Sequence, residues 1–202
     1  MKNSQITIPE LSCTISKKDL ARLVTLLQSG FFRSTENPTP FLLFLSSLPG
    51  FTRDYILNDI GTLFLNGDAI DDFELPLTGK TATIALSSAM PGLCGSILKK
   101  GSPHAALRRT RVVKIEEKSG DTVLVRIRLF NIIALERGPE LFAEGVQIRS
   151  ADLISFLSLR PSLLQTMHDI SFAGNTVFGE HLLDTLAPHP DILLKTLCDE
   201  SL

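Results

Sequence analysis

The stretch that decides the fold is residues 110–133, TRVVKIEEKSGDTVLVRIRLFNII. Two runs rich in β-branched residues, 110–117 and 122–133, flank the turn-forming residues 118–121. A period of two residues is expected when one side of a strand is buried and the other side meets water. The sequence therefore predicts an antiparallel hairpin. Its second strand alternates apolar with basic side chains, namely Val123, Val125, Ile127 and Leu129 against Arg126 and Arg128.

Helices and short strands interleave irregularly over the rest of the chain. Ser16 predicts the N-cap of a helix through Leu27, and Ser150 predicts the N-cap of another. Further helices are expected over 41–48, 52–58, 178–186 and 191–198, and strands over 5–8, 62–65, 81–87, 146–148 and 168–172. Residues 33–40 are expected to be a polar loop. This order favours an α+β fold with a mixed or antiparallel sheet over a doubly wound parallel sheet.

The only linker-like segment is Lys100-Gly101-Ser102-Pro103. It suggests an α+β subdomain over residues 1–100 and a subdomain of hairpin and helices over residues 101–202. A single domain over residues 1–202 remains the alternative, since four residues do not establish a boundary. With 202 residues the chain is long enough to bury a core without cross-links.

Two segments carry a partial family resemblance. Leu63-Phe64-Leu65-Asn66-Gly67 and the run from Leu77 to Leu86 resemble the C-terminal half of the β-grasp sulfur-carrier and ubiquitin-like families. The resemblance implies a β-grasp-like layout for the N-terminal half, residues 1–90. In those families the carrier function resides in a free C-terminal Gly-Gly, whereas here the strand continues into more than a hundred further residues. The carrier function is therefore not expected.

The charge distribution is uneven, although the net charge is only −2. Residues 75–115 hold seven lysines and arginines and no acidic residue, whereas acidic residues outnumber basic ones on both sides. An acid-free basic run between acidic flanks is typical of an anion site. It is more often found in a fold whose basic middle faces its acidic flanks within one chain or across a subunit interface.

Cysteine usage and hydropathy point to a cytoplasmic protein. The three cysteines, Cys13, Cys94 and Cys198, are far apart and odd in number, which argues against a disulfide framework and a structural zinc site. The first residues lack the apolar core of a secretory signal. The longest apolar run, residues 41–45, is far shorter than the roughly 20 residues that cross a bilayer, so no membrane association is expected.

The most suggestive functional stretch is the loop over residues 89–100, which follows an apolar strand. Its glycines permit close backbone approach, and consecutive N–H groups at a turn or a helix start can hold an anion. The candidate anion-binding residues are Gly92, Gly95, Ser96, Lys99, Lys100 and Arg108. The loop has neither the phosphate-binding nor the dinucleotide-binding glycine pattern. A tight strand-to-helix connection explains the same glycines without a ligand.

The other groups of candidate residues give weaker support for a functional site. Cys94 could be a nucleophile with His104 as its base, but a buried inert thiol is the commoner state. His181, Glu180 and His189 lack a metal-ligand spacing, so neither a metal nor a cofactor is expected. Nucleic acid is not an expected partner, because the chain has one tyrosine, no tryptophan and a pI near 6.1.

These patterns leave the function unknown and favour a binding or assembly protein over an enzyme. A homo-oligomer is expected, since 44% of the residues are hydrophobic and part of that surface suits a second copy. The alternative is an enzyme or sensor that binds a small anionic ligand at the loop over residues 89–100.

Overall fold

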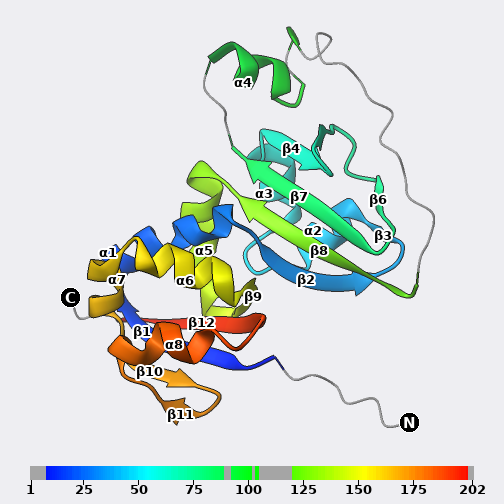
Figure 1. The fold of residues 1–202 in the computed structure, drawn as a ribbon. Helices are drawn as coiled ribbons and strands as arrows, with labels where there is room; N and C mark the ends of the chain where they lie inside the picture. Colours follow the sequence, from blue (N-terminus) through cyan, green and yellow to red (C-terminus); the bar gives the residue numbers. More distant parts are fainter. Residues whose placement is uncertain (1–7, 89–91, 102, 105–119, 200–202) are drawn as a thin grey trace. The chain divides into compact units, whose positions relative to one another are not determined.

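The chain forms two compact units, which are considered one at a time (Figure 1). The computed structural model describes residues 8–88, 92–101, 103–104 and 120–199. Unit 1 comprises residues 1–26 and 142–202, and unit 2 comprises residues 27–141. The chain passes from one unit to the other within two helices, η1 (Val24–Gln28) and α5 (Asn131–Glu144). Helices and a mixed sheet in each unit make the fold α+β, as predicted.

Unit 1 holds five strands of a ten-stranded mixed sheet, in the order β11-β10-β1-β12-β9. The strands are β11 (Asn175–Thr176), β10 (His168–Phe172), β1 (Glu10–Ser16), β12 (Asp191–Asp199) and β9 (Val146–Arg149). Strand β1 runs parallel to β12 and antiparallel to β10, and β12 runs antiparallel to β9. One face is buried because apolar side chains alternate along the strands, as at Leu11, Ile15, Ile192 and Leu194.

Short helices complete the core of unit 1. They are α1 (Lys17–Leu23), α6 (Ser150–Ser158), α7 (Pro161–Thr166), η3 (Gly179–His181) and α8 (Leu182–Leu186). Each of the four α-helices contributes at least one buried leucine, namely Leu20, Leu153, Leu163 and Leu182. The predicted cap of α1 is confirmed, because Ser16 Oγ accepts a hydrogen bond from the Asp19 N–H at 3.2 Å.

Unit 2 holds the other five strands of the ten-stranded sheet, in the order β2-β8-β7-β4-β5. The strands are β2 (Phe31–Glu36), β8 (Thr122–Leu129), β7 (Thr81–Ser87), β4 (Thr62–Leu65) and β5 (Asp68–Ala69), and β3 (Thr39–Pro40) pairs with β6 (Pro76–Leu77) in a small sheet. Strands β7 and β8 are parallel, and the other neighbours among these five strands are antiparallel. The helices are α2 (Phe41–Ser46), α3 (Arg53–Asn58), α4 (Gly92–Leu98) and the first residues of α5.

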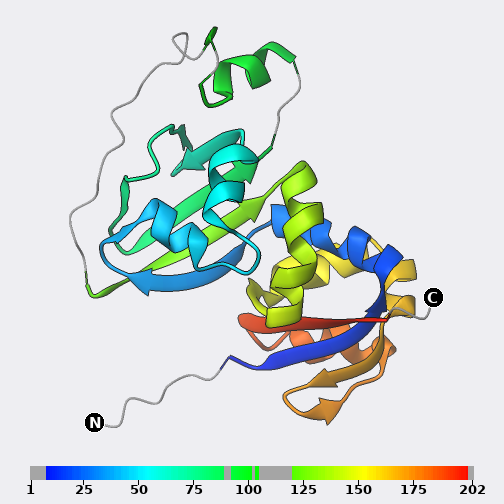
Figure 2. The same ribbon diagram turned by 180° about the vertical axis from the view of Figure 1, so that it is seen from behind.

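The two faces of this sheet differ. Helices α2 and α3 lie behind it in Figure 1 and in front of it in Figure 2, so they cover one face. That face carries the fully buried Val125, Ile127 and Ile84. The other face, called the open face here, carries half-buried side chains, namely Phe32, Phe64, Thr83, Ala85, Arg126 and Arg128.

The predicted hairpin is wrong in its pairing. Strand β8 pairs with β2 on one side and with β7 on the other, so both of its edges are occupied. The predicted partner strand, residues 110–117, lies outside the described residues. The predicted alternation within β8 is confirmed, because Val123, Val125 and Ile127 are fully buried.

Four other local predictions are wrong. Residues 191–198 form strand β12, not a helix, and residues 33–36, where a loop was expected, form part of strand β2. The strand expected to run to Ile133 ends at Leu129, and Asn131 begins helix α5, which was not predicted. Ser150 is the first residue of α6, and Arg149 occupies the N-cap position without a side-chain hydrogen bond.

The N-terminal half does not close as one β-grasp sheet. Strand β1 lies between β10 and β12 of unit 1, whereas β4 and β7 belong to unit 2. The turn chemistry behind the resemblance is present, since Asn66 and Gly67 have φ values of 53° and 90° between β4 and β5. Neither passage between the units falls at the linker-like segment near residue 100.

Candidate functional site

The predicted anion loop leads into the short helix α4. Gly92 begins this helix with a φ of +73°, a left-handed conformation that glycine adopts without strain. Gly95 is buried one turn later. Ser96 Oγ lies 2.9 Å from His104 Nδ1, and Lys99 is exposed. The helix has only seven residues, so its dipole adds little to an anion site.

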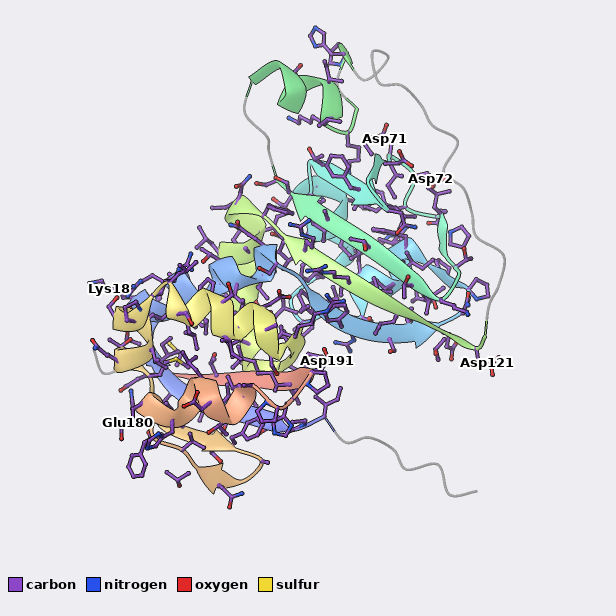
Figure 3. All side chains as sticks on the ribbon, in the orientation of Figure 1. Lys18, Asp71, Asp72, Asp121, Glu180 and Asp191 are labelled. Atoms are coloured by element: carbon purple, nitrogen blue, oxygen red, sulfur yellow. The ribbon has the colours of Figure 1, made fainter. Side chains whose placement is uncertain are left out.

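Lys100 is fixed by contacts within unit 2. Its N–H donates to the Gly61 carbonyl at 2.8 Å, and its Nζ donates to the Leu57 carbonyl at 2.5 Å. The same Nζ lies 4.7 Å from the centroid of the Phe73 ring. Burial lowers the pKa of Lys100, and the nearby Asp71 carboxylate, labelled in Figure 3, opposes that shift. Lys100 therefore connects the residues after α4 to helix α3, through Leu57, and to Gly61, which follows that helix.

The structure describes only some of the other residues that the sequence suggested as catalytic, anion-binding or metal-binding. Arg108 and the side chain of Cys94 lie outside the described residues. His181 and Glu180 contact each other at 3.5 Å, and the ring of His189 packs on Phe172 at a centroid distance of 4.9 Å. No group of three potential metal ligands occurs within the described ranges.

A cavity of about 220 Å³ lies on the open face of unit 2. It is placed at the carboxyl ends of the parallel strands β7 and β8, where Leu86 pairs with Leu129 and the Phe130 N–H donates to the Leu86 carbonyl at 2.9 Å. Carboxyl ends of adjacent parallel strands are the usual place for ligands in open sheets that contain them. The lining is mostly apolar and consists of Phe64, Ala85, Leu86, Ser87, Phe130 and Asn131.

The polar side of this cavity is formed where β8 leads into α5. Asn131 has a φ of +54° and is the first residue of this 14-residue helix. Its Nδ2 donates to Ser87 Oγ at 3.2 Å, which joins the ends of β8 and β7. The N-terminus of a helix carries partial positive charge, so the cavity opens beside a region that favours anions.

Arg128 brings a cation to the same place. Its guanidinium carbon lies 5.3 Å from the centroid of the Phe130 ring, which lines the cavity. Its Nε donates to the Gln28 carbonyl at 2.7 Å, which fixes the side chain on the open face. The terminal amino groups of Arg128 are the donors suited to a carboxylate or phosphate.

Arg126 has a structural role two residues earlier on β8. Its Nε and Nη2 donate to the Ser29 carbonyl at 3.0 and 2.5 Å, and its guanidinium carbon lies 5.8 Å from the Phe32 ring centroid. Gly30 makes this packing feasible, because a Cβ there would lie 2.8 Å from Arg126 Nε. The two arginines thus hold the turn that precedes β2.

Sequence reasoning placed the ligand site after β7 and missed the cavity itself. Phe64, Phe130 and Asn131 come from two distant segments that meet only through the order of the strands. The signal that could have indicated them is the pair Phe130-Asn131, which directly follows an alternating strand and precedes a helix.

Comparison with protein-family models, with curated proteins and with solved structures finds no match to this chain. Every helix in the part of the chain that the structure describes is too short or too polar to span a membrane.

Proposed function

We propose that this protein binds a small ligand that combines an apolar body with an acid group, and that the ligand occupies the cavity on the open face of unit 2. The observation that carries the proposal is the position of Arg128 beside an apolar cavity at the carboxyl ends of β7 and β8. Ligand sites of this kind are mostly apolar, with a few polar groups that fix orientation.

Each part of such a ligand has a counterpart in the cavity. The rings of Phe64 and Phe130 suit a flat or aliphatic body. The guanidinium of Arg128 and the N-terminus of α5 suit the acid group, since both favour negative charge. The expected role is that of a binding or sensing protein.

The predicted loop site is kept as the alternative place for the anion. There the glycines, Ser96 and Lys99 of α4, with Lys100 and Arg108, would take a simple anion such as phosphate without an apolar body. Gly95→Val separates the two alternatives, because a β-branched side chain would obstruct the loop and leave the cavity on the open face unchanged.

The test is calorimetric titration of the full chain with 2-naphthoate, with the uncharged 2-naphthalenemethanol, and with inorganic phosphate. Naphthoate should bind, and the alcohol should bind at least about tenfold more weakly, since a charged hydrogen bond is worth roughly 1.4 kcal/mol or more. Arg128→Gln should weaken naphthoate binding to the level of the alcohol. The matched control is Arg126→Gln, which alters the same strand away from the cavity.

Three results would contradict the proposal. The first is that naphthoate does not bind. The second is that the Arg128→Gln variant binds naphthoate as well as the wild type does. The third is that phosphate binds and that Gly95→Val abolishes this binding, which would favour the loop site. Ala85→Leu gives a second check, because the added atoms fill the cavity without removing a charge.

We also propose a homo-oligomer and a cytoplasmic location, both expected from the sequence. Two apolar side chains of unit 1, Leu159 and Phe178, are 77% and 71% exposed, and a second copy would remove such surface from water. The free thiols of Cys13 and Cys198 suit a reducing compartment.

A further inference from the structure

The cavity on the open face of unit 2 has a floor of small side chains. Strand β7 lies between β4 and β8 (Figure 1) and contributes Ala85 and Ser87 to the lining. The pairing of the strands places Ala85 between Phe64 of β4 and Arg128 of β8. Directly paired residues of neighbouring strands point to the same face of a sheet, so these three side chains form one row across the open face.

A second row of side chains crosses the same strands two residues further along. Thr62 of β4 pairs with Ser87 of β7. Phe130 continues the parallel pairing one residue beyond β8, since its N–H donates to the Leu86 carbonyl at 2.9 Å. The second row therefore runs from Thr62 through Ser87 to Phe130.

The ends of the two rows define two diagonals across the cavity. Phe64 and Phe130 lie at the ends of one diagonal and supply apolar walls. Arg128 and Thr62 lie at the ends of the other diagonal and supply polar groups. From the usual spacing of strands and residues, the Cα atoms of Arg128 and Thr62 are roughly 12 Å apart. A flat ligand along this diagonal would lie between the two rings and reach a polar group at each end.

The hydroxyl of Thr62 is buried without a hydrogen bond. Thr62 is 1% exposed, and its Oγ1 finds no hydrogen-bond partner in the part of the chain that the structure describes. A buried hydroxyl of this kind is unfavourable, because it has lost its hydrogen bonds to water and gained none in return. The paired Ser87 lines the cavity, and its Oγ accepts a hydrogen bond from Asn131 Nδ2 at 3.2 Å. A polar group of a ligand that reaches past Ser87 would give Thr62 its partner.

We infer that the ligand of this cavity is a hydroxylated aromatic acid, which lies along the polar diagonal with its acid group at Arg128 and its hydroxyl at Thr62. This inference rests on the proposed function, because it assigns a second polar group to the ligand proposed there. A site that hydrogen-bonds a hydroxyl of its ligand discriminates strongly against the analogue that lacks it, since the protein group is then left unpaired. Thr62 is therefore a specificity-determining residue.

The experiment is calorimetric titration of the full chain with 2-naphthoate and with two hydroxylated forms of it. The 6-hydroxy form carries its hydroxyl at the end of the rings opposite the acid, and the 4-hydroxy form carries it on the ring that bears the acid. The 6-hydroxy form should bind at least about fivefold more tightly than 2-naphthoate, because its hydroxyl pairs with Thr62. The 4-hydroxy form should show no such gain, because its hydroxyl does not lie along the diagonal.

The variant Thr62→Val tests the assigned partner. Valine has a shape similar to that of threonine and lacks the hydroxyl, so this variant should bind 2-naphthoate like the wild type and lose the gain for the 6-hydroxy form. It should melt no lower than the wild type, because it removes an unpaired buried hydroxyl. Thr83→Val is the matched control, since Thr83 lies on the same face of β7 and pairs with Arg126, away from the cavity, and it should keep the gain.

The outcomes distinguish this inference from the proposed function. If 2-naphthoate binds and the 6-hydroxy form binds no more tightly, the inference is overturned and the proposed function stands. A gain that persists in Thr62→Val, or an equal gain for the 4-hydroxy form, would also overturn it, because the hydroxyl would then lie elsewhere. If none of the three compounds binds, the proposed function fails and the inference fails with it.

Discussion

The thiol of Cys13 illustrates how burial controls reactivity at a single residue. Cys13 is 2% exposed, and burial raises its pKa to about 12. The thiolate is the reactive form, so this cysteine should resist alkylation in the folded protein. We expect iodoacetamide at about pH 8 to modify the exposed Cys198 and to spare Cys13, as read by peptide mass spectrometry. Equal rates at the two cysteines in folded protein would contradict the packing of β1.

Asp19 links the cap of α1 to acid stability. Burial disfavours its charged form, but hydrogen bonds from Arg22 and Ser16 outweigh that effect and hold the pKa of Asp19 below its ordinary value. A carboxyl group with a lowered pKa stabilises the fold above about pH 4, and this contribution is lost as the pH falls through the pKa of the folded state.

Asp19→Asn should therefore lower the free energy of unfolding by about 1 kcal/mol at pH 7. The difference from the wild type should shrink as the pH falls through the lowered pKa of Asp19 in the folded state, because both side chains are then neutral. Urea denaturation at several pH values measures it. A difference that stays constant over this range would show that the charge of Asp19 contributes nothing.

At the scale of the element, β8 is buried on one face and structured by arginines on the other. Val125→Asp would bury an unpaired charge and should leave unit 2 unfolded. Arg126→Ala should cost about 1–2 kcal/mol, because it removes the bonds to the Ser29 carbonyl. From the sequence alone we expect a smaller loss of stability, because the alternating pattern of β8 indicates that Arg126 lies on the face that meets water. Urea denaturation of the two variants, followed by circular dichroism, distinguishes these cases, and equal behaviour would contradict the register of β8.

Strand alternation was readable from the sequence where one face is polar, as in β8. It was not readable in β12, where Ile192, Leu193 and Leu194 form a continuous apolar run that suits a helix as well as a strand. This segment forms a strand because β1, from the other end of the chain, pairs with it in parallel. Tertiary pairing thus overrides local preference.

The prediction of where α5 begins was wrong for a similar reason. The sequence predicts a strand to Ile133, yet α5 begins at Asn131 and continues to Glu144 with Pro139 inside. Packing stabilises this helix although its local propensity is weakened by the proline, since Leu141 and Phe142 on the following turn are buried. Caps that depend on one side chain, such as Ser16, were predictable from the sequence because their partners lie three residues away.

The ligand cavity was beyond sequence reasoning because its walls meet only in the folded sheet. The sequence placed an anion site just after β7, next to the observed cavity, on the strength of glycines and charge. Phe64 reaches that place because β4 pairs with β7, and Phe130 does so because β8 is the other neighbour of β7. Neither pairing follows from local patterns.

At the scale of the whole molecule, the oligomeric state is a prediction of composition. Light scattering at micromolar concentration should give about twice the chain mass of 22.1 kDa. Leu159→Glu and Phe178→Glu should lower that mass if these exposed side chains lie at the contact. A monomeric mass for the wild type would contradict the expectation.

We propose that the cavity on the open face of unit 2 holds the ligand. An NMR titration of the ¹⁵N-labelled full chain with 2-naphthoate tests it most directly, because the amide shifts locate the contact. We expect saturable shifts concentrated at Phe64, Ala85, Ser87 and Asn131, and smaller shifts in the Arg128→Gln variant. Shifts confined to Gly92–Lys100, or the absence of saturable shifts, would contradict it.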